Sequence, residues 1–340
     1  MFSFKKSKKI LNITIKDYVI RIVETTGNDL SSIKFFTEKA LPSGLIKHGK
    51  IINEIEFYSF MQELVKELKI KNQQIQFNVP DSLVIMRQID ISTELKEKKE
   101  ILEYIEMEIG NSIHLPFQDP IIDLVDLKEE ISEPENETQF VTFFAVPVEE
   151  VRKYTEVFID VSLNPIAADV GILGDYRYFN HTNSIYEDHI YMLVEFNMNS
   201  ILLGVFSSNQ LEFLRYQELD VSLANHHYDE YAGKITWDYV EDEYVIEGLI
   251  EDQVNELERI MNFYRFSLHK GEKMVTDLVL LGDYPDLQTI YQKVMNRYEE
   301  ISIHYLDGHD IEKINENISP AFIPTLGLAL RGGNSYASRS

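Results

Sequence analysis

The stretch Ile190–Tyr216, IYMLVEFNMNSILLGVFSSNQLEFLRY, decides the fold because it contains three strand-like runs in succession. Apolar and aromatic residues gather in Ile190–Phe196, Ser200–Phe206 and Leu211–Tyr216, and short polar turns separate these runs. After an insertion, apolar residues at helical spacing predict a long helix from about Asp252 to His269. The stretch therefore predicts a three-stranded meander followed by a helix.

The same pattern opens the chain. Apolar residues predict two strands joined at Lys16 and Asp17, and a third strand from Ser32 to Ala40. Asn53, followed three residues later by Glu56, is a capping signal for the next helix. Two such units about 180 residues apart indicate two duplicated lobes, each a sheet covered by helices, with the cleft between them as the expected binding site.

Further elements are predicted between the two meanders. They are a strand pair around Pro80 and Asp81, a helix and a second strand pair, which cover Ile75–Val79 with Leu83–Ile89, Ile101–Ile109, and Ile121–Leu127 with Phe140–Val146. The acidic loop EEISEPENET, residues 129–138, separates the last two strands. We interpret it as a solvated hairpin tip, with an interaction surface as the alternative.

Composition and charge exclude several classes of protein. The 340 residues carry 57 acidic and 32 basic side chains, a formal net charge of -25, so the chain repels the phosphates of nucleic acids. Disulfides and thiolate sites are excluded because the chain contains no cysteine. No apolar run is long enough for a membrane span or a signal core, so we expect a cytosolic protein. Phe2 and Phe4 lie among lysines in MFSFKKSKK, which we interpret as a solubilising flank, with contact to an anionic membrane as the alternative.

Several spaced motifs follow one another along most of the chain. They are LNITIKDYVIRIVE (11–24), LPSGLIKHGKIIN (41–53), IEMEIGNSIHLPF (105–117), FFAVPVEEVRKY (143–154), LNPIAADV (163–170), NELERIMNFYRF (255–266), LVLLGDYPDL (278–287) and PTLGLALR (324–331). Their order and spacing resemble the PilM family, actin-like cytoplasmic proteins of type IV pilus machines that are similar in architecture to the division protein FtsA. In this resemblance the first motif takes the place of a phosphate-binding hairpin, 255–266 that of a helix at the nucleotide cleft, and 278–287 that of the adenosine motif.

The resemblance implies an α/β actin-like fold, that is, a duplicated ribonuclease H-like fold of two lobes with a small α+β subdomain inserted in the first. The implied parts are a first lobe (1–79 and 320–333), the inserted subdomain (80–148), a second lobe (149–319) with an insertion at about 217–250, and a disordered tail (334–340).

The resemblance also implies a role and partners. It predicts a scaffold that docks the cytoplasmic N-terminal peptide of a bitopic PilN-like membrane protein in a groove near the inserted subdomain, and that contacts the pilus assembly ATPases. The protein would then be cytoplasmic and peripheral to the inner membrane. A shared fold does not fix function, so these are expectations from analogy.

The nucleotide motifs of the family are altered here. Thr14 and Lys16 occupy the aspartate and glycine positions of the first hairpin, and Glu195 and Asn197 those of the second. Of the paired glycines of the adenosine motif only Gly282 remains, followed by Asp283 and Tyr284. Phosphate turns usually need glycine, and a carboxylate usually positions the metal, so we expect no hydrolysis and no obligatory cofactor. Weak binding of ATP with Mg²⁺ is the alternative, in a degenerate cleft made of Lys16, Arg21, Glu195, Asn197, Glu256, Arg259 and Gly282.

Two other functions compete with the scaffold. An ATP-binding switch would change its affinity for partners with nucleotide state. A small-molecule kinase of the same superfamily is more distant, because phosphoryl transfer depends on metal and phosphate contacts that the altered motifs lack. His226 and His227 are adjacent, and neighbouring residues of a strand point to opposite faces, so we predict no metal site there. We also identify no catalytic residue.

Overall fold

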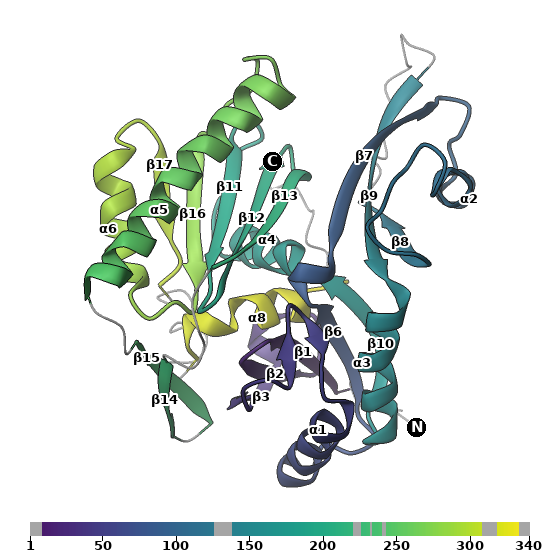
Figure 1. Ribbon diagram of the computed structural model, residues 1–340, viewed down its shortest axis with the longest axis vertical. Helices are drawn as coiled ribbons and strands as arrows, with labels where there is room; N and C mark the ends of the chain where they lie inside the picture. Colours follow the sequence, from purple (N-terminus) through teal and green to yellow (C-terminus); the bar gives the residue numbers. More distant parts are fainter. Residues whose placement is uncertain are drawn as a thin grey trace, which may run out of the picture.

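The computed structural model describes residues 9–125, 138–219, 226–231, 233–239, 243–307 and 318–332. Two five-stranded sheets form the two lobes, and a three-stranded sheet extends from the first (Figure 1). The tail 334–340, residues 1–8 and most of the acidic loop lie outside the described residues. In the part of the chain that is described, no helix is long and apolar enough to cross a membrane.

The first sheet has the order β10-β6-β1-β2-β3. Its strands are β1 (Ile10–Lys16), β2 (Val19–Thr25), β3 (Ile33–Ala40), β6 (Gln74–Val79) and β10 (Asn164–Val170). β1, β2 and β3 form the expected antiparallel meander, and β6 and β10 add to it in parallel. A small hairpin of β4 (Ile46–Lys47) and β5 (Lys50–Ile51) precedes helix α1 (Glu54–Leu68), and the Asn53 side chain caps this helix as predicted.

The structure corrects two expectations about this region. The second lobe was expected to begin at residue 149, but β10 pairs with β6, and α3 (Val148–Asp160) is the crossover that leads to it. The strand pair expected around Pro80 does not form either. β6 belongs to the first sheet, whereas β7 (Ile85–Ser92) pairs with β9 (Thr138–Pro147). Both errors have the same origin, because parallel and long-range pairings leave no signal in the local pattern.

The inserted subdomain has its own small core. Its sheet has the order β7-β9-β8, with β8 (Pro120–Leu124) paired to β9 as expected. Helix α2 (Lys98–Glu108) buries Ile101 and Ile105 in a cluster with residues of this sheet.

The second sheet, β13-β12-β11-β16-β17, repeats the directions of the first. The repeat confirms the duplication that the two meanders predicted. Its strands and helices are β11 (Ile190–Phe196), β12 (Ser200–Ser207), β13 (Gln210–Glu218), α5 (Glu243–Asn262) continued by a π-helical turn (Phe263–Leu268), β16 (Asp277–Gly282), α6 (Leu287–Arg297) and β17 (Ser302–Tyr305). A hairpin of β14 (His226–Tyr231) and β15 (Lys234–Tyr239) lies within the expected insertion.

Helices α4 (Gly171–Thr182) and α8 (Ile323–Ala329) lie between the two lobes (Figure 1). They touch through two glycines, since a Cβ added to Gly327 would lie 1.8 Å from the carbonyl oxygen of Gly174. Alternating residues of β11 enter different cores: Tyr191 and Leu193 join the core shared with the first lobe, whereas Met192 and Val194 pack under α5 and α6. Both faces of the strand are therefore buried.

Candidate functional site

Two hairpin turns face each other between the lobes. The turn from β1 to β2 carries Asp17 and Tyr18, and the turn from β11 to β12 carries Asn197, Met198 and Asn199. The backbone N–H of Met198 donates to the Tyr18 hydroxyl at 3.4 Å, so the two turns are in contact. This is the place where the sequence predicted a nucleotide cleft.

The Lys16 ammonium bridges the two lobes. It lies at the end of β1 and donates to the carboxylate of Glu195 and to the amide oxygen of Asn197, both in the second lobe. Burial opposes its charge, but attraction by Glu195, Asp283 and Asp81 outweighs burial and raises the pKa of Lys16. Lys16 is therefore charged, and its contacts with Glu195 and Asn197 connect the two lobes.

Arg21 makes a second ionic contact between the lobes. Its Nε atom lies 2.8 Å from Glu38 on β3, and one of its terminal nitrogens lies 2.7 Å from Asp283, which follows β16. The Tyr18 hydroxyl donates to the same Asp283 carboxylate at 2.6 Å. Burial alone would raise the pKa of Asp283, but Arg21 and Lys16 overcome this effect and lower it. We call Lys16, Tyr18, Arg21, Glu38, Glu195, Asn197 and Asp283 the interlobe cluster.

Two carboxyl groups beside the cluster, one half-buried and one fully buried, were missed by the sequence analysis. Asp81 follows β6, and Asp175 lies on α4 with no exposed surface. Burial and then repulsion from Glu195 raise the pKa of Asp81 to about 7, and the same causes raise the pKa of Asp175 well above its usual value. Neither oxygen of Asp175 has a hydrogen-bond partner among the described residues. Each is a single aspartate in an ordinary context, so no sequence signal marks it.

Gly282 has a structural task in this site. Its φ is +126°, and an added Cβ would lie 2.0 Å from the carbonyl oxygen of Phe196 on β11. The backbone N–H groups of Asp283 and Tyr284 donate to that same oxygen at 3.0 and 3.1 Å. Only glycine permits this close approach, which sets the position of Asp283 opposite Arg21.

The structure brings together most, but not all, of the predicted site residues. The Lys16 ammonium contacts both Glu195 and Asn197. Arg21 contacts Asp283, the residue that follows Gly282. Glu256 and Arg259 lie instead on α5, where they pair with each other at 3.3 Å and Glu256 pairs with Arg215 of β13 at 2.8 Å. No hydrogen bond or ion pair within the described ranges joins them to the cluster.

The donor set of the cluster does not suit a magnesium nucleotide. A phosphate needs free cations and backbone amides, but Lys16 and Arg21 already contact carboxylates, and Glu195 and Asp283 would repel it. Thr14 is also engaged, because its hydroxyl accepts from Asn78 at 3.2 Å and from Thr325 at 3.0 Å. Among the described residues no group of three or more histidines and carboxylates has the geometry of a metal site.

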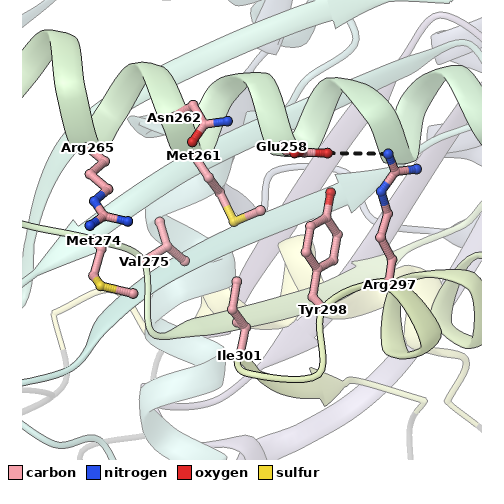
Figure 2. A pocket seen from close by; sticks show the side chains of 9 residues that line it. All are labelled: Glu258, Met261, Asn262, Arg265, Met274, Val275, Arg297, Tyr298 and Ile301. Atoms are coloured by element: carbon pink, nitrogen blue, oxygen red, sulfur yellow. Dashed lines mark hydrogen bonds and ion pairs between the residues drawn. The ribbon is translucent and has the colours of Figure 1, made fainter.

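A separate cavity of about 290 Å³ lies on the outer side of the second lobe. Figure 2 shows it between the end of α5, the start of β16 and the end of α6, with the Glu258–Arg297 ion pair at its rim. Its lining residues are Glu258, Met261, Asn262, Arg265, Met274, Val275, Arg297, Tyr298 and Ile301. None of them belongs to the interlobe cluster.

Comparisons with known proteins place the chain in a family. The sequence model described as "Type IV pilus assembly protein PilM" matches residues 12–332. No curated protein matches at a significant level.

Solved structures show the fold. A PilM-PilN type IV pilus biogenesis complex is 18% identical with a TM-score of 0.72, covering 96% of this chain and 99% of that one. An MreB5 of Spiroplasma citri bound to ADP is 7% identical (TM-score 0.49, 95% of each chain), and a protein of Bacteroides thetaiotaomicron with an actin-like ATPase fold is 16% identical (TM-score 0.47, 92% and 97%). The match to the PilM-PilN complex, over nearly the whole of both chains, confirms the actin-like fold that the family resemblance implied.

Proposed function

This chain belongs to the PilM family of type IV pilus assembly proteins, and we propose that it is a catalytically silent scaffold in a type IV pilus or a related competence-type machine. The observation that carries this proposal is the interlobe cluster. Its two cations, Lys16 and Arg21, are neutralised by the protein's own carboxylates at the place where the fold would hold phosphates.

The proposed partner is the cytoplasmic N-terminal peptide of a bitopic PilN-like protein. The support is the similarity to a PilM-PilN complex, together with exposed apolar side chains on the inserted subdomain and on the neighbouring first lobe. These side chains are Met107, Ile121 and Phe140 on the subdomain and Ile159 and Ile166 on α3 and β10. β10 is also an edge strand of its sheet. An extended peptide can use such an edge and such apolar side chains.

The proposal includes location and further partners. Binding to a membrane-anchored peptide would hold the protein at the cytoplasmic face of the inner membrane. The pilus assembly ATPases are the other proposed partners, and they would supply the hydrolysis that this chain is not expected to perform.

Calorimetric titration with the PilN-like peptide, in the presence and absence of ATP and Mg²⁺, tests the scaffold. We expect one dissociation constant under both conditions and no heat from ATP alone. Ile166→Glu should weaken peptide binding, whereas Tyr244→Glu, at an exposed position on α5 in the other lobe, is the matched control. If nucleotide changes peptide affinity, the protein is a switch. If no peptide binds, the docking role fails.

A further inference from the structure

The β14–β15 hairpin reaches from the second lobe to the edge of the first sheet (Figure 1). The backbone N–H of Glu38, on the edge strand β3, donates to the Gly233 carbonyl at 2.9 Å. The N–H of Ile235 donates to the Glu38 carboxylate at 2.7 Å, and Lys39 pairs with Glu230 at 2.7 Å. The hairpin is thus attached to the opposite lobe by backbone and side-chain contacts.

Trp237 of this hairpin covers the two facing turns. Its ring meets Tyr18 edge-on, with 5.3 Å between ring centroids, and lies 5.2 Å from Tyr228 on the paired strand. Trp237 and Ile235 pack on a small apolar cluster that contains Tyr18 of the first turn and Met198 of the second. One side chain of the hairpin therefore lies over both turns.

One carboxylate, that of Glu38, connects the hairpin to the interlobe cluster. Glu38 is 2% exposed and accepts from Arg21 with one oxygen and from the Ile235 N–H with the other. Arg21 in turn contacts Asp283 in the second lobe. A chain of buried charge contacts therefore runs from β16 through the first sheet to the hairpin, and each group in it is satisfied by the next.

The tip of the hairpin is shaped for this contact. Gly233 has a φ of +74°, and a Cβ placed there would lie 2.7 Å from the Thr37 hydroxyl oxygen but 3.5 Å from the Thr37 Cβ. The approach to β3 therefore depends on the missing side chain at position 233, with the Thr37 hydroxyl as the atom it would meet.

We propose that the β14–β15 hairpin, in its described residues 226–231 and 233–239, is an intramolecular strap that fastens the second lobe to the first across the facing turns and fixes the lobes without a nucleotide. The strap goes beyond the scaffold function and does not depend on a pilus partner. It also closes the two turns to ligands on the side that Trp237 covers.

The chain carries its own reporter, because Trp237 is its single tryptophan. In the wild-type full chain we expect blue-shifted emission, weak quenching by iodide, and no change when ATP and Mg²⁺ are added. Emission and quenching equal to those of N-acetyltryptophanamide would overturn the strap without any variant being made.

Gly233→Ala tests the contact directly. Overpacking at Thr37 should raise iodide quenching and speed hydrogen exchange of the Glu38 amide about 5- to 150-fold. Gly271→Ala is the matched control, since Gly271 also has a positive φ, +92°, but no atom within 4 Å of an added Cβ. Thr37→Ala added to Gly233→Ala should restore slow exchange, because the clashing oxygen is gone.

The outcomes separate the strap from turn strain and from the scaffold. If Gly233→Ala leaves quenching and exchange at wild-type values, or if Thr37→Ala does not rescue it, the hairpin does not hold the lobes. If the strap behaves as expected while the PilN-like peptide fails to bind, only the proposed function is lost.

Discussion

The Asp81 carboxyl should make the wild-type protein less stable as the pH rises. Replacing this carboxyl by an amide should remove that loss of stability. The pKa of Asp81 is raised from 3.8 to about 7 by burial and by Glu195, so the folded protein keeps a proton that the unfolded chain releases near pH 4. Between these values the unfolded state binds fewer protons, so the free energy of unfolding falls as pH rises. The loss is complete above about pH 7.

The magnitude follows from the size of the shift. A rise in the pKa of Asp81 from 3.8 to about 7, at about 1.4 kcal/mol for each pH unit, lowers the free energy of unfolding by up to about 4 kcal/mol. This is an upper limit because the residue is half-buried and solvent screens part of the repulsion. Asp175 acts in the same direction, since its pKa is also raised by burial and by Glu195.

Urea unfolding of the wild type and Asp81→Asn, followed by circular dichroism at pH 5, 6, 7 and 8, measures this effect. The wild type should lose stability across the series, whereas Asp81→Asn, which mimics the protonated group, should lose distinctly less. Asp252→Asn, at an exposed position on α5, should follow the wild type. Parallel curves for the wild type and Asp81→Asn would refute the reasoning, because the proton would then not be held at Asp81.

Three further substitutions test other parts of the structure. Gly282→Ala should prevent stable folding, because its Cβ would lie 2.0 Å from a carbonyl oxygen of β11. Gly110→Ala, where an added Cβ has nothing within 4 Å, should fold, and soluble yield and melting temperature distinguish the two variants. Arg21→Met leaves two buried carboxylates without their cation and should cost about 3 to 5 kcal/mol in urea unfolding; an unchanged midpoint contradicts this. Asn53→Ala removes the N-cap of α1 and should cost about 1 kcal/mol, with Asn53→Asp near wild type.

The meanders and their duplication were predictable because they depend on local patterns. Apolar residues gather in runs within Ile10–Ala40 and Ile190–Tyr216 that break at polar turns, and consecutive strands joined by such turns pair with each other. The cap at Asn53 was readable for the same reason, since the side chain contacts a backbone amide three residues away. The position of β10 was not, because its partner β6 lies far away in the sequence.

The residues of the site were predictable only where a family motif marked them. Lys16, Glu195 and Asn197 were identified because they replace residues of known hairpins, and the structure joins them. Their chemistry follows less well from the sequence: the resemblance places Lys16 in a degenerate nucleotide cleft, whereas its ammonium contacts the carboxylate of Glu195. Lys16 and Glu195 are 179 positions apart in the sequence, so no local pattern predicts that they pair.

The position of Glu256 and Arg259 away from the interlobe cluster was not predictable from a local pattern either. They lie three positions apart on one helix and pair with each other, which is a local property. Their assignment to the cleft came from the motif alone, and the contacts of α5 with β13 place them on another face.

The cluster suggests how a nucleotide-binding fold keeps its lobes together when the glycines are gone. In a switch, phosphates attract groups from both lobes, so the attraction exists only while the ligand is bound. Here Lys16 and Arg21 of the first lobe form ion pairs with Glu195 and Asp283 of the second. Both partners of each pair belong to the chain, so the attraction does not depend on a ligand. A triphosphate would have to displace these carboxylates and leave them buried without their cations, a cost of several kcal/mol for each broken pair. The arrangement therefore favours a permanently closed pair of lobes over a two-state cleft, in keeping with the proposed scaffold.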